Sequence, residues 1–328
     1  MDSKKLRLIF MGTPGFAVES LKALVEGGYN VVAVITAPDK PAGRGQKLAE
    51  SAVKTFAVQA GIPVLQPEKL KNPAFLEQLA AVKADLQIVV AFRMLPEVVW
   101  NMPSLGTFNL HASLLPAYRG AAPLNWAIIN GEKETGVTTF LLSHEIDTGK
   151  VLFKEKTSIG DHETVGDLHD RLMVTGAQLV TRTVDALAAG SVNPIPQDEL
   201  VKAGAEVRHA PKLFRETMKI DWTADASRVR NLIRGLSPYP GAWTTLVHNP
   251  DGRETELKIF FAELTDGPQA TPGTLLSDGK SFIKVACGLG WLSITDLQLS
   301  GKKRMKTPEF LRGLQNLGEF QSLFYLSL

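Results

Sequence analysis

The stretch "LRLIFMGTPGFAVESLKALVEGGYNVVAVITA", residues 6–37, decides the fold class. It opens with a short apolar run that ends in a glycine turn at Gly12. Residues 15–28 then repeat apolar side chains near helical spacing and end on a glycine pair, which is typical of a helix stop. Residues 30–37 form a second apolar run. A strand, a helix and a second strand in this order predict the repeating unit of a parallel sheet.

The same alternation continues along the chain. Its predicted elements are helices over 52–61 and 73–84, and strands over 86–92, 106–111, 136–143 and 150–155. A long helix is expected over 164–189, where Thr164 and Asp167 resemble a capping box. We therefore expect an α/β fold in which residues 1–190 form a domain with a Rossmann-like, mostly parallel sheet. Ligands of such sheets bind outside the carboxyl ends of the strands.

The pattern changes after the long helix. Residues 191–207 are polar and contain prolines, and we interpret them as a linker. Residues 208–328 are expected to form a second, smaller domain with a helix over 224–235. Short strand-like runs with turns between them follow at 241–248, 256–264, 272–278, 281–288 and 290–299. Closely spaced short strands predict a small β-barrel, with an oligonucleotide-binding (OB-like) type as the natural candidate.

Composition narrows the functional classes. The 328 residues are 44% hydrophobic and 21% charged, as in an ordinary globular protein, and no apolar run is long enough to predict a membrane span. The N-terminus has no secretory signal pattern. The single cysteine, Cys287, excludes an intrachain disulfide and a cysteine-based zinc site. We expect a monomeric cytoplasmic protein that binds no metal and no membrane.

A pair of polar residues ends one predicted strand. Because side chains alternate along a strand, Asn109 and His111 share one face. An amide donor beside an imidazole suits stabilisation of an oxyanion together with proton transfer. Asp147 lies in the predicted turn "SHEIDTGKV" (143–151), from which its carboxylate could accept a hydrogen bond from His111. The alternative is that Asn109 and His111 are satisfied structural residues and Asp147 forms a simple Asx-turn.

Two loops are rich in basic residues. Residues 38–48 ("PDKPAGRGQKL") contain Lys40, Arg44 and Lys47 and are expected to form a long mobile loop. Residues 301–307 add Lys302, Lys303, Arg304 and Lys306. Both loops could bind phosphates, or they could simply be solvated. A nicotinamide enzyme is disfavoured because "MGTPGF" lacks the G-x-G-x-x-G pattern.

These stretches together resemble one known family along nearly the whole chain. The segments that carry the resemblance are "MGTPGFA" (11–17), "PDKPAGRGQKL" (38–48), "NLHASLLPAYRGAAPLNWAIINGE" (109–132), "EIDTGKV" (145–151), "PGAW" (240–243) and "GKKRMK" (301–306). They are similar to the methionyl-tRNA formyltransferases, which belong to the superfamily of formyltetrahydrofolate-dependent formyltransferases. The chain departs from the usual family pattern at "AFRML" (91–95) and in the turn before Asp147, but it keeps Asp147 itself.

The resemblance implies an activity and a set of site residues. The activity would be transfer of a formyl group from 10-formyltetrahydrofolate to the α-amine of methionyl initiator tRNA. Asn109, His111 and Asp147 match the family's catalytic residues. The positions that match the folate site are Phe92, Arg93, Met94, Ser113, Leu114, Leu115 and Pro116. Those assigned to tRNA are Lys40, Arg44, Lys47, Lys302, Lys303, Arg304 and Lys306.

Two other functions remain open from the residues alone. A formyl transferase that acts on a sugar nucleotide or a purine precursor would keep Asn109, His111 and Asp147, but it would not need the 38–48 loop or the C-terminal barrel. A non-catalytic nucleic-acid-binding protein would need the basic loops but not those three residues together.

Overall fold

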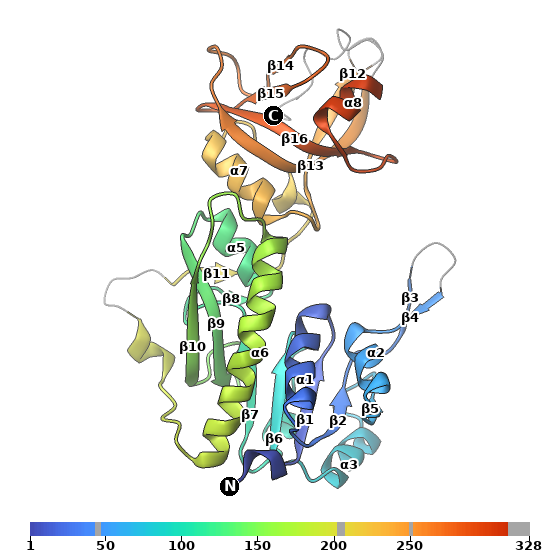
Figure 1. The fold of residues 1–328 in the computed structure, drawn as a ribbon, viewed down its shortest axis with the longest axis vertical. Coiled ribbons are helices and arrows are strands. Elements are labelled where there is room, and N and C mark those ends of the chain that lie inside the picture. The colour runs from blue at the N-terminus through green and yellow to red at the C-terminus, as the bar shows by residue number, and fades with distance from the viewer. Residues whose placement is uncertain (43–46, 202–206, 249–251, 314–328) are drawn as a thin grey trace. The chain divides into compact units, whose positions relative to one another are not determined.

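The computed structural model describes residues 1–42, 47–201, 207–248 and 252–313 (Figure 1). Contacts group the chain into two compact units. The first consists of Met1–Pro123, Thr135–Ser158 and His169–Ala210, and the second of Leu124–Glu134, Ile159–Leu168 and Pro211–Leu328. The division expected from the sequence, with a linker over 191–207, stays a prediction. No helix in the described ranges is long and apolar enough to cross a membrane.

The first unit is built on a seven-stranded sheet whose order is β10-β9-β7-β6-β1-β2-β5. The strands are β1 (Leu8–Gly12), β2 (Val31–Ile35), β5 (Val64–Leu65), β6 (Leu86–Val90), β7 (Thr107–His111), β9 (Glu134–Leu141) and β10 (Val151–Ser158). Strands β5, β2, β1, β6 and β7 pair in parallel, and β9 pairs antiparallel with β7. The predicted Rossmann-like, mostly parallel sheet is therefore confirmed. Chain order reverses between β1 and β6, which is where such sheets bind their ligands.

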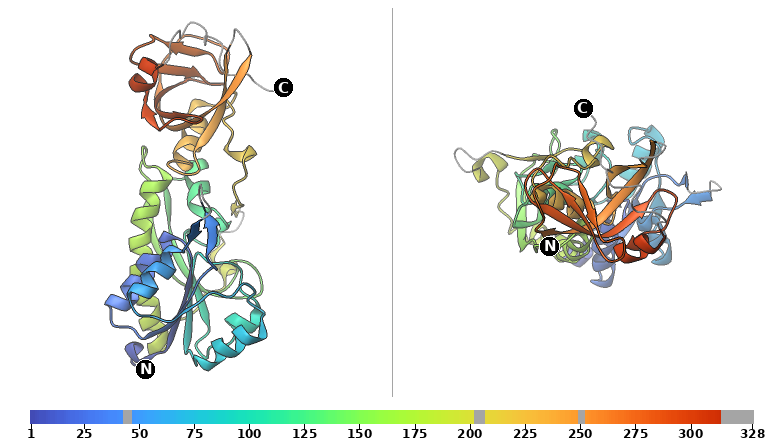
Figure 2. Two further views of the ribbon diagram at one scale, coloured as in Figure 1. Left: turned by 90° about the vertical axis from the view of Figure 1, so that its right-hand side faces the viewer. Right: turned by 90° about the horizontal axis from the view of Figure 1, so that it is seen from above.

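Helices cover both faces of this sheet (Figure 1, and Figure 2, left view). They are α1 (Gly15–Glu26), α2 (Ala52–Gln59), α3 (Pro73–Ala81), α4 (Glu97–Trp100) and, from His169 on, α6 (Val165–Ala189), with a 3₁₀ turn at Ser3–Lys5 before β1. Helix α5 (Pro123–Ile129) belongs to the second unit apart from its first residue. On one face, Ile9 and Met11 of β1 form a buried cluster with Phe75 of α3 and Val99 of α4. Burial of such side chains contributes roughly 1.5–3 kcal/mol each, which holds the strand ends in fixed positions.

The capping box predicted at the start of α6 is confirmed. The Thr164 hydroxyl donates to Asp167 Oδ2 at 2.6 Å, and the Asp167 N–H is 3.3 Å from the Thr164 hydroxyl oxygen. The hydrogen bonds from the Thr164 hydroxyl and N–H lower the pKa of Asp167. This reciprocal arrangement satisfies N–H groups that have no partner inside the helix.

Part of the basic segment 38–48, expected to be a loop, forms strand. Its described residues include a short antiparallel hairpin of β3 (Lys40–Ala42) and β4 (Lys47–Ala49). At the hairpin base, Asp39 accepts hydrogen bonds from Lys54 Nζ and, at 2.8 Å, from Gln66 Nε2. These partners come from distant sequence positions, so local composition could not reveal them.

The second unit contains an antiparallel sheet of order β12-β13-β16-β15-β14, with β17 paired to β16. Its elements are α7 (Ala226–Gly235), β12 (Ala242–His248), β13 (Arg253–Thr265), β14 (Leu275–Ser277), β15 (Ile283–Ala286), β16 (Trp291–Leu299), β17 (Met305–Lys306) and α8 (Thr307–Gly313). The β13–β16 register shifts between Ile259 and Ala262, and such irregularities bend a strand. This curled antiparallel sheet agrees with the predicted small barrel domain.

Candidate active site

Strand β7 places Asn109 and His111 at its carboxyl end. Asn109 lies opposite Val89 of β6 and Phe140 of β9, and His111 lies opposite Thr138. The two side chains share a face, as predicted. Asn109 is half-buried, and within the described residues its side-chain amide makes no hydrogen bond. That amide is therefore free to donate to a ligand.

His111 is buried, with 7% of its surface exposed, and both ring nitrogens face polar groups. Nε2 lies 2.8 Å from the main-chain carbonyl oxygen of Tyr118. Because a carbonyl can only accept, we assign the proton of the neutral ring to Nε2. Nδ1 faces Asp147 Oδ2 at 3.8 Å. Nδ1 is therefore the nitrogen that can gain or lose a proton beside a carboxylate.

The position of Asp147 corrects one detail of the sequence prediction. The distance of 3.8 Å is too long for the expected hydrogen bond from His111 and is that of an ion pair when the ring is protonated. Asp147 Oδ2 instead accepts the N–H of Gly120 at 3.0 Å. The carboxylate is thus anchored to the main chain while it faces the imidazole.

The turn that carries Asp147, residues 143–150 and here called the acidic turn, has an unusual backbone. Asp147 has a φ of +55°, a conformation that side-chain-bearing residues rarely adopt. Thr148 Oγ1 donates to the Glu145 carbonyl at 3.1 Å and lies 3.0 Å from Ser143 Oγ. A Cβ on Gly149 would stand 1.6 Å from the carbonyl oxygen of Leu141, so only glycine fits there. Local geometry therefore requires glycine at position 149, and the Thr148 hydroxyl stabilises the turn.

The segment after His111 forms a turn. The Leu115–Pro116 peptide bond is cis, and the N–H of Ala117 donates to the carbonyl of Leu114 at 3.2 Å. Thr138 Oγ1 donates to the Ser113 carbonyl at 2.6 Å, which holds the segment against β9.

Comparison with known proteins assigns the chain to a family. The sequence pattern named formyl transferase matches residues 4–184, and the one named formyl transferase, C-terminal domain, matches residues 212–315. Over 322 residues the chain is 58% identical to the methionyl-tRNA formyltransferase of Parabacteroides distasonis, covering 98% of this chain and 99% of that protein. The chain belongs to the formyl transferase family.

Further relatives agree with this assignment. The methionyl-tRNA formyltransferase of Bacteroides thetaiotaomicron is 58% identical over 316 residues, covering 96% of this chain and 98% of that protein. Among solved structures, an N-formyltransferase from Helicobacter canadensis in complex with folinic acid and dTDP-3-aminofucose superposes with a TM-score of 0.65. It is 19% identical and covers 92% of this chain and 100% of that one, so it supports the fold alone.

In this formyl transferase, one of the segments predicted to bind folate, Phe92–Met94, follows β6. Its three side chains differ in their burial and in their contacts. Arg93 Nη1 donates to the Glu68 carbonyl at 2.8 Å, and Nη2 donates to the carbonyl of Pro67. Burial lowers the pKa of Arg93, and its Nε is buried without a partner in the described residues. Met94 is 72% exposed, whereas Phe92 packs at the edge of the cluster between the sheet and α3. The Arg93 guanidinium thus fastens a neighbouring loop, and folate contacts in this segment stay a prediction.

The basic residues assigned to tRNA fall into three groups. Arg44 and the side chain of Lys47 lie outside the described residues, whereas Lys40 is described at the start of β3. Lys302 and Lys303 are exposed, and neither side chain has a partner within the part of the chain that the structure describes.

Arg304 and Lys306 form the third group, because both bind one buried carboxylate. Arg304 donates to both oxygens of Asp296, at 2.8 and 2.7 Å, and Lys306 Nζ lies 3.2 Å from Oδ2. Burial alone would raise the pKa of the Asp296 carboxyl group. The hydrogen bonds from Arg304 and Lys306 and their positive charges together outweigh this effect, so the pKa lies below its usual value.

Two functional groups were missed from the sequence, namely the carbonyl of Tyr118 and the N–H of Gly120. Both belong to the main chain, so residue type gives little signal. Gly120 itself has a φ of +125°, and a Cβ there would lie 2.4 Å from the carbonyl oxygen of Ala210 in the adjacent β11 (His209–Ala210). Its strand, β8 (Arg119–Gly120), can therefore approach β11 only with glycine at this position.

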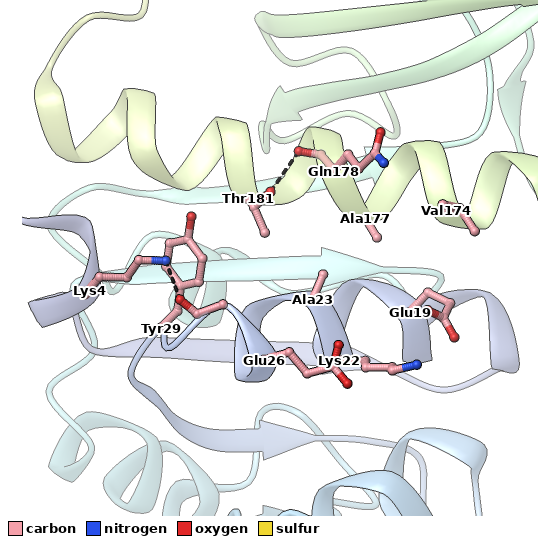
Figure 3. A pocket seen from close by; sticks show the side chains of 11 residues that line it. Lys4, Glu19, Lys22, Ala23, Glu26, Tyr29, Val174, Ala177, Gln178 and Thr181 are labelled. Atoms are coloured by element: carbon pink, nitrogen blue, oxygen red, sulfur yellow. Dashed lines mark hydrogen bonds between the residues drawn. The ribbon is translucent and has the colours of Figure 1, made fainter.

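A separate hollow of about 380 Å³ lies between α1 and α6, on the helical surface of the first unit (Figure 3). Lys4 and Tyr29 both line this hollow, and Lys4 Nζ lies over the Tyr29 ring, 3.2 Å from its centroid. None of the three catalytic candidates lines this hollow, so we do not assign it to the reaction. No group of three or more His, Cys, Asp or Glu side chains among the described residues could hold a metal ion.

Proposed function

We propose that the protein transfers the formyl group of 10-formyltetrahydrofolate to the α-amine of methionine on initiator tRNA. The observation that carries this proposal is that Asn109 and His111 share one face at the carboxyl end of β7, where ligands of such sheets bind, and that Asp147 of the acidic turn faces His111. The choice of substrate is supported by the 58% sequence identity to methionyl-tRNA formyltransferases over nearly the whole chain.

The free amide of Asn109 fits a formyl donor. Folate supplies the formyl carbon, and an α-amine with an ordinary pKa of about 7.7–8.0 is available uncharged near neutral pH. The chain therefore needs no strong nucleophile of its own. Asn109 would donate to the oxygen on which negative charge develops, a role whose loss typically costs about 100- to 1000-fold in turnover.

His111 would handle the proton. Tyr118 holds Nε2, so the amine proton would pass to Nδ1 as the amine attacks the formyl carbon, and Asp147 would stabilise the resulting imidazolium. The imidazolium would then give this proton to the folate nitrogen as the bond from that nitrogen to the formyl carbon breaks, and tetrahydrofolate leaves. The acidic turn keeps that carboxylate in place through the N–H of Gly120. Each group thus has one task, and none of the three requires a metal.

We assign the folate pocket to two segments, Phe92–Met94 after β6 and Ser113–Pro116 after β7. They follow neighbouring parallel strands and therefore leave the sheet at the same edge. The support for this assignment is their position together with the family resemblance.

The tRNA would be bound through its phosphates by Lys40, Arg44, Lys47 and the 302–306 loop. Neutralising exposed cations should weaken binding and reduce its salt dependence by about one unit per phosphate contact. Lys302→Ala and Lys303→Ala test this most cleanly because their side chains have no structural partner in the described residues. A slope unchanged after both substitutions and Arg44→Ala would contradict phosphate binding by these loops.

The substrate test uses purified protein, 10-formyltetrahydrofolate and methionine-charged initiator tRNA, with N-formylmethionine as the readout. A dTDP-amino sugar and glycinamide ribonucleotide serve as competing acceptors. Transfer to either of these, but not to the tRNA, would overturn the proposed substrate and keep the chemistry. We further propose that the enzyme works as a monomer in a reducing cytoplasm, consistent with its one buried cysteine.

A further inference from the structure

Gln197 lies in the segment 191–207, which the sequence predicted to be a linker. Its side chain is nevertheless only 3% exposed, and every hydrogen-bonding group of its amide has a partner. Its Nε2 donates to the main-chain carbonyls of Asp147 and Gly149, both at 2.8 Å. Its Oε1 accepts from Nε and Nη2 of Arg119, at 3.0 and 2.7 Å. A primary amide offers two N–H bonds and one oxygen with two lone pairs, so the side chain is saturated. If the amide were flipped, its N–H groups would face the N–H donors of Arg119 and its oxygen would face the two carbonyl oxygens. The hydrogen bonds therefore fix its orientation.

These four contacts join the two elements that hold the catalytic carboxylate. The two carbonyls belong to the acidic turn, and Arg119 directly precedes Gly120, whose N–H binds Asp147 Oδ2. The carboxylate therefore lies between two pieces of backbone that Gln197 fastens to each other.

The backbone at this point needs such support. A φ of +55° at Asp147 is strained for a residue with a side chain. Left without hydrogen bonds, the partly buried carbonyl of Asp147 and the buried carbonyl of Gly149 would each add the cost of an unsatisfied polar group. Gln197 removes the second cost and so stabilises the turn in the one conformation that directs the carboxylate at His111.

We propose that Gln197 is a positioning residue that acts on formyl transfer through Asp147. This inference rests on the proposed role of Asp147 in the reaction. Gln197 itself touches neither His111 nor Asn109 in the structure, and its effect is to keep Oδ2 near Nδ1.

Gln197→Glu is the sharpest test because it preserves size. The new carboxylate still accepts from Arg119, but it cannot donate to the two carbonyls and instead repels them. A displacement of about 1 Å near reacting groups can cost about 100-fold in rate, so we expect kcat to fall 10- to 100-fold. KM for 10-formyltetrahydrofolate and for the charged tRNA should change less than threefold. Gln178→Glu makes the same change on the exposed surface of α6 and should leave both constants unchanged.

A double-mutant cycle separates positioning from general loosening of the fold. If Gln197 acts through Asp147, adding Gln197→Glu to Asp147→Asn should lower kcat less than twofold further. An additive loss in the double variant, or a kcat of Gln197→Glu within twofold of wild type, would overturn the proposal.

A second readout does not depend on the substrate. The Gly120 N–H is protected by its bond to Asp147, so its amide hydrogen exchange, measured by NMR, should accelerate at least tenfold in Gln197→Glu. Unchanged exchange at Gly120 would overturn the positioning role even if the enzyme acts on a different amine. Absence of formylation by the wild-type protein, with accelerated exchange in the variant, would instead reject the proposed function and retain the inference about Gln197.

Discussion

Replacing Arg304 with methionine should destabilise the second unit, although sequence alone places this residue among tRNA contacts. Arg304 binds both oxygens of Asp296, whose side chain is 7% exposed, and its guanidinium carbon lies 4.5 Å from the Phe260 ring centroid. Removing one partner of a buried pair typically costs about 3–5 kcal/mol. Arg304 is itself 41% exposed and Lys306 still reaches Asp296, so we expect a loss of about 2 kcal/mol in the free energy of unfolding.

The pH dependence of this loss follows from the lowered pKa of Asp296. A carboxyl group with a depressed pKa contributes stability above its unfolded pKa of about 3.9 and loses that contribution as the pH falls through its folded pKa. The difference between wild type and Arg304→Met should therefore be constant from pH 7 to about pH 5 and shrink below about pH 4.

Urea unfolding followed by tryptophan fluorescence measures both effects, with Lys303→Met as the matched control from the same loop. The control should change the free energy of unfolding by less than about 0.5 kcal/mol and should weaken tRNA binding. If Arg304→Met is no less stable than Lys303→Met at pH 7, the structural role of the Asp296 pair is wrong.

Three further predictions concern other parts of the chain. Gly149→Ala should lower kcat at least tenfold and reduce the melting temperature, because its Cβ would meet the Leu141 carbonyl; wild-type kinetics would contradict the argument for the acidic turn. Cys287 should not react with a thiol reagent at pH 8 until the protein is denatured, because burial, with a smaller effect of a nearby carboxylate, raises its pKa to about 12. Thr164→Ala should cost about 1 kcal/mol of unfolding free energy through loss of the cap, and the size of the loss is read from the urea midpoint.

Much of the fold could be predicted because its signals are local. The apolar runs at residues 6–12 and 86–92 end within two residues of β1 and β6, and the periodicity at 164–189 matches α6. Asn109 and His111 were found for the same reason, since alternation along one strand puts them on one face. Binary pattern and strand periodicity depend on neighbours in sequence and can be read without coordinates.

The remainder depends on contacts between distant residues. Nothing near Gln197 in sequence indicates that it reaches the acidic turn, 50 residues away. Asp296 likewise gives no local sign that it will bind Arg304. The contacts of the Tyr118 carbonyl and the Gly120 N–H could not be predicted from residue type, because every residue has such main-chain groups. In each of these cases the missed feature is a hydrogen bond that residue type and local pattern do not reveal.

The central claim is that His111, next to Asp147 and Asn109, moves the proton in formyl transfer. The most direct test is the single-turnover rate of N-formylmethionyl-tRNA formation by His111→Ala with saturating 10-formyltetrahydrofolate, after confirming that folate still binds. We predict a rate at least about 100-fold below wild type, as for loss of a general acid–base group. A rate within threefold of wild type would contradict the account.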